Sequence, residues 1–382
     1  MSTAGDQFGP FDGRVWLNTA HQGPLPRPAV EAAKQAAALK AAPHRIDDSA
    51  FSEVPERLRG LLARLVGGAP EHIVLGNSTS YGLHLIANGL PWNHGDEVLV
   101  IVGDYPATIL PWQRLASYGV RVRPLRPETG LLTAGELSAA IGPRTRVLAV
   151  TWVDSFTGRA VDLDALGQIC RQAGMLLVVN ASQAMGARPI DVSVTPVDAV
   201  ISCGCKWLCG PYGTGFCWLC PSLLERLRPQ QAYWLTMQAG RSLDQMRDTT
   251  IRDDLGSSGF DVFCPASFAT ALPWIASLEL LLDTGIGPIA AWDQQLADRL
   301  VTGLDLARYR LVSPTGGPAR STLVVVRSSD GSTAQRHRQL TAAGIDTAYR
   351  EGNLRFSLHL FNTLDEVDQA LDALHAPLKS AG

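Results

Sequence analysis

The chain contains 382 residues, of which 46% are hydrophobic, and this is enough to build a large globular core. The net charge of −3 gives no electrostatic case for binding to nucleic acid or to another polyanion. Residues 1–12 lack the basic and apolar regions of a signal peptide, and no apolar run is long enough for a transmembrane helix. We therefore predict a cytoplasmic protein without a nucleic-acid or membrane partner.

In chain order, the first strong pattern is an apolar segment that runs into Gly76–His84, where a helix should begin. A helix N-terminus that carries the hydroxyl groups of Ser78, Thr79 and Ser80 suits a phosphate dianion. A well-capped helix without a ligand would show the same residues. The pattern alone therefore leaves both interpretations open.

Apolar runs then alternate with helical patterns. Strands are predicted at Glu97–Val102, Arg146–Trp152, Met175–Asn180 and Asp198–Ser202, and a helix is predicted over Asp162–Ala173. This alternation predicts the α/β class, with a mostly parallel sheet between helices. In such sheets ligands bind beyond the carboxyl ends of the strands, so we expect a site there.

A single lysine follows the last of these strands. The chain has four lysines, Lys34, Lys40, Lys206 and Lys379, and only Lys206 lies among apolar and small residues. A desolvated lysine has a lowered pKa and can form a Schiff base with a carbonyl compound. A strand-end lysine that reaches out to water is the alternative interpretation.

The seven cysteines are concentrated, because five of them fall between residues 203 and 220. Cys217-Trp-Leu-Cys220 has the spacing of a redox or zinc motif, but no second Cys/His pair is near it in the sequence. We interpret the cysteines as reduced, small core residues and predict no metal site.

After about Ile286 a long helical stretch leads into a βαβ-like tail. Strands are predicted at Thr322–Arg327 and Asn353–Ser357, and a helix over Thr363–Leu378. We predict that residues 21–285 form a large domain. Residues 286–382 should pack with residues 1–20 as a smaller α+β C-terminal domain.

The segment around Lys206 reads Cys203-Gly-Cys-Lys-Trp-Leu-Cys-Gly-Pro-Tyr-Gly-Thr-Gly215. It resembles the lysine signature of the class V aminotransferase group in the aspartate aminotransferase superfamily. That group includes cysteine desulfurases, isopenicillin N epimerase-like proteins and ergothioneine C–S lyase-like proteins. The resemblance implies the fold type I architecture and a homodimer. It also implies pyridoxal 5'-phosphate (PLP) held on Lys206 as a Schiff base.

The resemblance also assigns residues to the cofactor. Ser78, Thr79 and Ser80, with Cys203 and Cys205, match positions that bind the phosphate, and Cys264 matches a residue that reaches the phosphate of the partner subunit. Tyr105 matches the side chain that stacks on the ring, and Ser155 and Gln183 match residues that meet the ring hydroxyl.

Further matches concern the substrate. Arg355 lies in a tail motif, Arg350–Asn362, and matches the residue that binds the α-carboxylate of an amino-acid substrate. An interdomain ion pair is the alternative role for Arg355. His21 and Gln22 lie in a segment that resembles the loop lining the substrate entrance, and either residue could instead be an ordinary surface side chain.

Four departures from the family pattern are chemically informative. Asn180 stands where the family has an aspartate that pairs with the ring nitrogen, and an amide cannot balance a pyridinium charge. Cys203 and Cys205 replace a serine and a histidine, and Cys264 replaces a threonine, although thiols are weak donors. Asn180 favours elimination over transamination, unless it is a neutral natural variant or an engineered substitution.

The cysteine positions argue against a desulfurase. Cysteine desulfurases need a nucleophilic cysteine shortly before the arginine that Arg355 matches, and no cysteine follows Cys264 in this chain. We predict a lyase that cleaves the C–S bond of a cysteine S-conjugate, similar to ergothioneine lyases and to cysteinyl-processing enzymes of lincosamide antibiotic assembly. A decarboxylating oxidative deaminase, an aminotransferase or an epimerase remains open. A non-enzymatic binding module on the same fold is the third reading.

Overall fold

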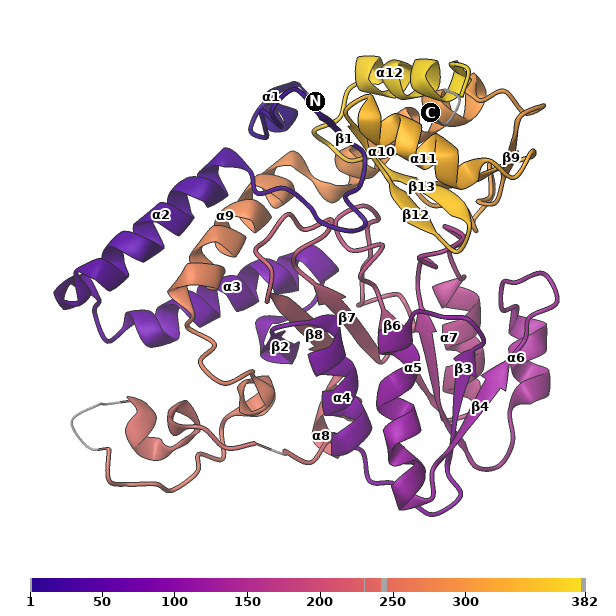
Figure 1. The fold of residues 1–382 in the computed structure, drawn as a ribbon. Coiled ribbons are helices and arrows are strands. Elements are labelled where there is room, and N and C mark those ends of the chain that lie inside the picture. The colour runs from indigo at the N-terminus through magenta and orange to yellow at the C-terminus, as the bar shows by residue number, and fades with distance from the viewer. Residues whose placement is uncertain (1, 230, 242–245, 379–382) are drawn as a thin grey trace.

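The computed structural model describes residues 2–229, 231–241 and 246–378, so Lys379 lies outside the described residues. Its centre is a seven-stranded sheet (Figure 1). In spatial order the strands are β2 (Ile73–Gly76), β8 (Gly215–Leu219), β7 (Ala199–Cys203), β6 (Leu176–Asn180), β5 (Thr145–Thr151), β3 (Glu97–Ile101) and β4 (Arg121–Leu125).

The prediction of a mostly parallel sheet is confirmed. Strands β4, β3, β5, β6 and β7 run parallel, and β8 and β2 pair antiparallel at one edge. Along β5, Leu148 and Val150 enter one apolar cluster, whereas Val147 and Ala149 enter the other. Because successive side chains point to opposite faces, both faces of the sheet are buried and need helical cover.

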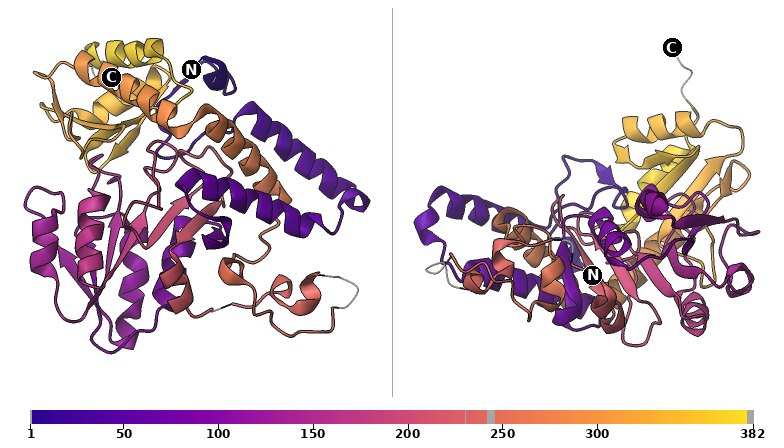
Figure 2. Two further views of the ribbon diagram at one scale, coloured as in Figure 1. Left: turned by 180° about the vertical axis from the view of Figure 1, so that it is seen from behind. Right: turned by 90° about the horizontal axis from the view of Figure 1, so that it is seen from below.

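Helices provide that cover, and Figures 1 and 2 show them around the sheet. A group formed by α2, α3 and α9 packs together beyond the β2 edge. The helices up to residue 303 are α1 (Ser2–Gly5), α2 (Arg27–Ala41), α3 (Ala50–Val66), α4 (Thr79–Gly89), α5 (Pro106–Gln113), α6 (Ala134–Ala140), α7 (Leu163–Gln172), α8 (Pro221–Arg226), α9 (Phe268–Thr284) and α10 (Ile286–Gly303).

The C-terminal part is a second layer with its own apolar cluster. Its sheet has the order β12 (Ala348–Arg350), β13 (Asn353–Ser357), β10 (Leu323–Ser328) and β9 (Tyr309–Leu311), with α11 (Thr333–Ala342) and α12 (Leu364–His375). A short parallel pair, β1 (Val15–Trp16) with β11 (Ile345–Asp346), joins the N-terminal segment to this layer.

Two expectations for the tail are wrong. The tail is not βαβ-like, because β10 and β13 pair antiparallel. Strand β12 lies between them in the sequence, and a tight turn at Glu351 and Gly352, both with positive φ, reverses the chain before β13. The last helix ends at His375 and not at Leu378, since Pro377 disfavours helical geometry in the residue before it.

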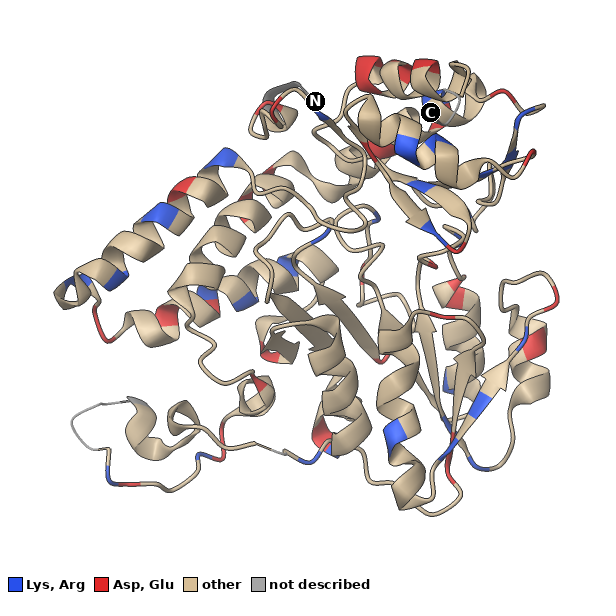
Figure 3. Cartoon of the chain, viewed as in Figure 1, with Lys and Arg blue, Asp and Glu red and all other residues tan. Residues whose placement is uncertain are grey.

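Charged residues lie mainly on the helices and loops around the central sheet, as the coloured segments of Figure 3 show. Helix α2 carries more basic than acidic residues, whereas α12 carries four acidic residues and no lysine or arginine. No single helix of the described chain is long and apolar enough to cross a membrane. Helices α9 and α10 are long and apolar enough only when they are taken together, as a pair bent by 81°, and this judgement considers length and composition alone.

Candidate active site

Lys206 lies in the bend that follows β7, at the carboxyl ends of the parallel strands. Its side chain is partly buried, and Nζ lies 5.4 Å from the centre of the Tyr105 ring. Both residues line a cavity of about 300 Å³, within the size range of small-molecule sites. The cavity therefore lies at the carboxyl ends of the strands, where ligands bind in open α/β sheets.

The cavity collects nearly all of the residues that the sequence predicted, with Cys264 and Arg355 as the exceptions. The predicted residues that line it are His21, Gln22, Ser78, Thr79, Ser80, Tyr105, Ser155, Asn180, Gln183, Cys203, Cys205 and Lys206. Thr151, Ser182 and Tyr212 also line it and were not predicted. Ser182 stands between Asn180 and Gln183, so its place in that motif was the available signal.

One end of the cavity is the N-terminus of α4. Ser78 caps the helix, since its Oγ accepts a hydrogen bond from the Tyr81 N–H at 3.1 Å. Thr79 Oγ1 lies 2.6 Å from Ser182 Oγ. A Cβ atom on Gly215 would lie 2.8 Å from the Ser78 nitrogen, so the absence of a side chain lets β8 approach this turn. A helix N-terminus with hydroxyls beside it has the chemistry to bind an anion such as a phosphate.

Cys203 and Cys205 meet at the same end. The hydrogen bond from Cys205, which outweighs burial, lowers the pKa of the Cys203 thiol, and Lys206, Ser182 and Thr79 act in the same direction. The same hydrogen bond, with burial, raises the pKa of Cys205. Of the two thiols, Cys203 is therefore the one that ionises more readily.

Two amide side chains of the lining, Asn180 and Gln183, already have hydrogen-bond partners within the protein. Asn180 Nδ2 donates to Thr108 Oγ1 at 2.9 Å, and Asn180 Oδ1 accepts from the Ser182 N–H at 3.1 Å. Gln183 Nε2 donates to the Ala20 carbonyl at 3.0 Å, and its Oε1 accepts from Trp207 Nε1 at 2.9 Å. Gln183 thus ties the N-terminal loop to the segment that carries Lys206, a role that the sequence did not indicate.

Arg355 lies on β13, outside the cavity lining but in contact with it. Its side chain is 4% exposed, and Nη1 donates to the carbonyl of Ser155, a lining residue, at 3.0 Å. Burial lowers the pKa of Arg355 to about 10, and Nε has no hydrogen-bond partner among the described residues. No ion pair in the described chain involves Arg355, which leaves this cation available for a substrate carboxylate.

The pKa of His21 is affected by Arg355 and by two other positive charges near the cavity. Burial lowers the pKa of His21, and the charges of Arg350, Arg355 and Lys206 lower it further. His21 therefore lies within electrostatic reach of three cations. Such a field at the mouth of the cavity would attract an anionic substrate group.

A buried ion pair contacts the backbone of the segment that carries Lys206. His359 Nδ1 lies 2.8 Å from Asp293 Oδ2, and His359 Nε2 lies 3.0 Å from the carbonyl oxygen of Trp207, the residue after Lys206. A carboxylate and a carbonyl both accept, so the ring must donate from both nitrogens and be protonated. Against the effect of burial, Asp293 raises the pKa of His359 to about 10. The sequence did not single out either residue.

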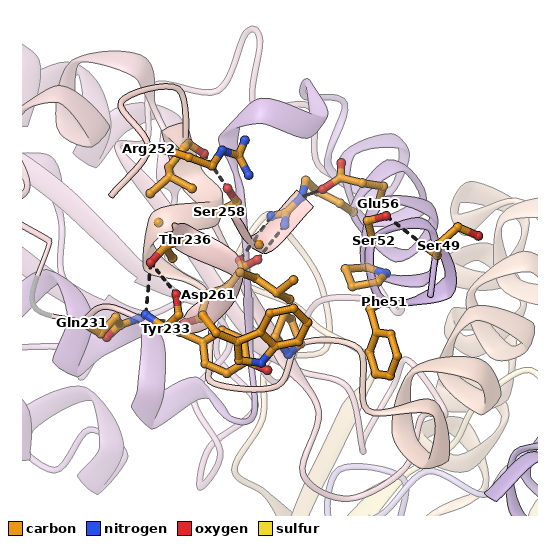
Figure 4. Close-up of a pocket in the computed structure, with 18 of the residues that line it drawn as sticks. Ser49, Phe51, Ser52, Glu56, Gln231, Tyr233, Thr236, Arg252, Ser258 and Asp261 are labelled. Atoms are coloured by element: carbon orange, nitrogen blue, oxygen red, sulfur yellow. Dashed lines mark hydrogen bonds and ion pairs between the residues drawn. The ribbon is translucent and has the colours of Figure 1, made fainter. Parts of the chain in front are cut away.

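A second, larger cavity of about 680 Å³ lies between α3 and residues 231–265 (Figure 4). Its described lining includes neither lysine nor cysteine, and Arg59 is already paired with Asp261 at 2.7 Å. Cys264 is near this region, exposed and hydrogen-bonded by the Tyr233 hydroxyl at 3.4 Å. Within one chain Cys264 therefore does not line the cavity that contains Lys206.

The smaller cavity fits PLP in the chemistry of its groups. It offers an anion site at α4, a reactive amine at Lys206, and an aromatic face at Tyr105. The buried guanidinium with a spare donor at Arg355 adds a place for a carboxylate beside it. No group of three or more potential metal ligands occurs among the described residues.

Comparison with known proteins identifies the class. Residues 15–370 match the aminotransferase class-V family. An isopenicillin N epimerase from Streptomyces clavuligerus is 32% identical over 384 residues, covering 95% of this chain and 94% of that protein. A probable cysteine desulfurase from Methanothermobacter thermautotrophicus is 29% identical, over 63% of this chain and 60% of that protein.

Solved structures show the same fold. The cystine C–S lyase C-DES, in complex with its product cysteine persulfide, matches with a TM-score of 0.84 and 22% identity over 95% of this chain and 97% of that chain. A C-DES variant with glycine covalently linked to its PLP cofactor gives a TM-score of 0.86 and 21% identity, over 97% and 98%.

The molecule is a fold type I, PLP-dependent enzyme that acts on an amino acid. The chain belongs to the aminotransferase class-V family.

Proposed function

We propose that the chain is a lyase that cleaves the C–S bond of a cysteine S-conjugate by β-elimination. The observation that carries the proposal is Asn180, a neutral amide at the position where the family pattern has an aspartate. Such an amide cannot balance a protonated ring nitrogen, so negative charge at the substrate α-carbon is poorly stabilised. Departure of a leaving group from Cβ relieves that charge, and transamination does not.

Different residues of the chain have different roles in this reaction. When bound, PLP supplies a conjugated ring that withdraws electrons from the substrate α-carbon. Lys206 Nζ anchors the cofactor and moves the α-proton, the α4 N-terminus holds the phosphate, and Arg355 binds the substrate carboxylate. The net reaction uses one water molecule and converts the conjugate into a thiol, pyruvate and ammonia.

A second candidate is epimerisation at the α-carbon. The isopenicillin N epimerase at 32% identity over 95% of this chain favours it. An epimerase returns a proton to the α-carbon on the opposite face and leaves the C–S bond intact. The two reactions therefore differ in their products and in their uptake of solvent hydrogen.

We also propose that the enzyme is a homodimer in which Cys264 approaches the cofactor phosphate of the partner subunit. Its exposed thiol and its absence from the lining of the cavity in its own chain support this assignment. Sedimentation at micromolar concentration should give a dimer. A fully active monomer would contradict the assignment.

The decisive experiment supplies the enzyme with PLP, in deuterated water, and with S-methylcysteine, S-benzylcysteine or cystine, and identifies the products by mass spectrometry. Pyruvate with the matching thiol or persulfide supports the lyase, and Lys206→Ala should abolish it. Recovered amino acid that carries deuterium at the α-carbon indicates an epimerase instead. An aldehyde with carbon dioxide indicates oxidative decarboxylation, and a sulfur-containing keto acid indicates transamination. PLP binding without any product across the panel would favour a binding module.

A further inference from the structure

A chain of hydrogen bonds links Asn180 to a carboxyl group outside the cofactor cavity. Asn180 Nδ2 donates to Thr108 Oγ1 at 2.9 Å, and Thr108 Oγ1 lies 2.8 Å from Thr151 Oγ1. The Thr151 hydroxyl donates to Asp104 Oδ1, and the Thr151 N–H donates to Asp104 Oδ2 at 2.9 Å. All four side chains are at most 8% exposed.

The backbone holds these four residues in place. Thr151 and Asn180 are the last residues of β5 and β6, and they are partners in the sheet register. Thr108 lies in the first turn of α5, and Asp104 lies in the loop between β3 and that helix. Three neighbouring strands therefore fix the geometry of the chain of hydroxyls.

The carboxylate sets the direction of every hydrogen bond in the chain. An ionised Asp104 only accepts, so the hydroxyl of Thr151 must donate to it. Thr151 then accepts from the Thr108 hydroxyl, and Thr108 can only accept from the Asn180 amide nitrogen. The Asn180 nitrogen is thereby directed to Thr108, and the Ser182 N–H, which can only donate, favours the same orientation by binding the Asn180 carbonyl oxygen.

We propose that Asp104 is a positioning residue that fixes the amide orientation of Asn180, so that Asn180 offers its remaining N–H group to the cofactor cavity. This inference rests on the proposed placement of Asn180 beside the cofactor ring. An N–H donor matches a ring nitrogen that carries a lone pair and disfavours a protonated one. The chain would then hold the cofactor in the state that suits elimination.

The arrangement is sensitive to pH through Asp104. Burial raises the pKa of Asp104 to about 6, although hydrogen bonds from Thr151 and Tyr105 act in the opposite direction. Asp154 raises it further, and Asp154 and Arg159 are the charged groups that line, with Asp104, a separate cavity of about 230 Å³. A protonated Asp104 can donate to Thr151, and the fixed direction of the chain is then lost.

The same logic explains why an aspartate at position 180 would conflict with Asp104. Two carboxylates would each take the hydrogen of the nearest threonine hydroxyl. The oxygens of Thr108 and Thr151, 2.8 Å apart, would then face each other without a hydrogen between them. One carboxyl would have to stay protonated.

The test is ¹⁵N NMR of the full chain labelled only at asparagine, which has seven side-chain amides. Spectra are recorded from about pH 4.5 to about pH 8, a range that brackets the titration of a carboxyl with a raised pKa, with PLP bound and after its removal. The Asn180 signals are assigned by their loss in Asn180→Ser. They should titrate with a midpoint near pH 6, the pKa of Asp104.

The pH dependence of the Asn180 signals should vanish in Asp104→Asn and in Thr108→Val. Thr108→Val keeps the side-chain volume but lacks the hydroxyl, and Thr108→Ser, which restores a hydroxyl, should restore the pH dependence. The Asn180→Asp variant should regain thermal stability when Asp104→Asn is added. Asn180 signals that ignore both pH and Thr108→Val would overturn the inference. Failure to bind PLP would instead refute the proposed function, because the cofactor-free spectra still decide the hydrogen-bond chain.

Discussion

The two sides of the active site use different chemistry. The side formed by the sheet surrounds the cavity with hydroxyls, amides and thiols, and Lys206 is the charged side chain it contributes to the lining. The C-terminal layer contributes buried charges, namely Arg355 on β13 and the His359–Asp293 pair between the tail and α10. Charge is costly to bury, and these three groups are held by backbone carbonyls or by each other.

This difference indicates a division of tasks. Fixed neutral dipoles on the sheet can orient a cofactor without forcing a charge on its ring. Charges in the C-terminal layer can bind a substrate carboxylate and keep the Lys206 segment in place. Variants on the sheet side should therefore change which reaction occurs, and variants on the C-terminal side should change binding and stability.

The largest effect is expected at Lys206, the exception on the sheet side. Lys206→Ala should lower kcat at least about a thousandfold, because it removes the group that moves the α-proton. Borohydride reduction and peptide mapping should place a pyridoxyl group on Lys206 of the unmodified enzyme. Lys34→Ala, on an exposed helix, is the control and should have no effect. Labelling at any other residue would refute the active-site assignment.

Arg355 tests the charged side. Arg355→Lys retains the charge but loses two-point binding of a carboxylate, so KM should rise about a hundredfold with a smaller change in kcat. Steady-state kinetics measure both constants. The exposed Arg350 provides a matched control, since Arg350→Lys should leave KM nearly unchanged. An unchanged KM in Arg355→Lys would show that another residue binds the carboxylate.

The buried ion pair gives a stability test. Asp293→Asn leaves an imidazolium without its counterion and should lower the free energy of unfolding by about 3 kcal/mol. Because His359 has a pKa near 10 when folded and about 6.5 when unfolded, its contribution is complete below pH 6.5 and is lost as pH rises through 10. Denaturant unfolding across this range should show that loss in the wild type but not in Asp293→Asn. Asp298→Asn, on the same helix but exposed, should change little.

Asn180 should control the outcome of the reaction more than its rate. Asn180→Asp restores a carboxylate opposite the ring nitrogen, and one pKa unit of stabilisation is about 1.4 kcal/mol. The ratio of transamination to elimination should therefore rise about tenfold, and the absorbance of the working enzyme should change. The Asp104→Asn background should enlarge the effect by removing the competing carboxylate. A product ratio and spectrum identical to the wild type would make Asn180 a neutral variant.

The smallest effect is expected at the phosphate end. Cys203→Ser replaces a thiol with a stronger hydrogen-bond donor and should lower the Kd for PLP about threefold. Equilibrium titration of the cofactor-free protein measures this change. Cys220→Ser, outside the cavity, is the control. Weaker PLP binding in Cys203→Ser would contradict this reasoning and show that the sulfur of Cys203 is needed there.

Much of the site was predictable because its parts follow strands in short motifs. Lys206 after β7 and the hydroxyls at the start of α4 stood out in the local sequence, whereas Asn180, at the end of β6, and Gln183 were assigned through the resemblance to the family pattern. The antiparallel course of the tail and the early end of α12 were missed, since each depends on a turn or a proline that a strand or helix pattern does not register. The division into two domains stays a prediction.

The sequence by itself indicated the fold class and singled out the lysine, because hydrophobic periodicity and the residues around Lys206 are local properties of the chain, and the resemblance to a family named most of the residues that line the cavity. Only the tertiary structure decided how distant residues act on that lining. Asp104 reaches Asn180 through two threonines, and His359 reaches the Lys206 segment through Trp207. These links depend on strand register and on burial, and residues far apart in sequence acquire them only when the sheet and the C-terminal layer pack together.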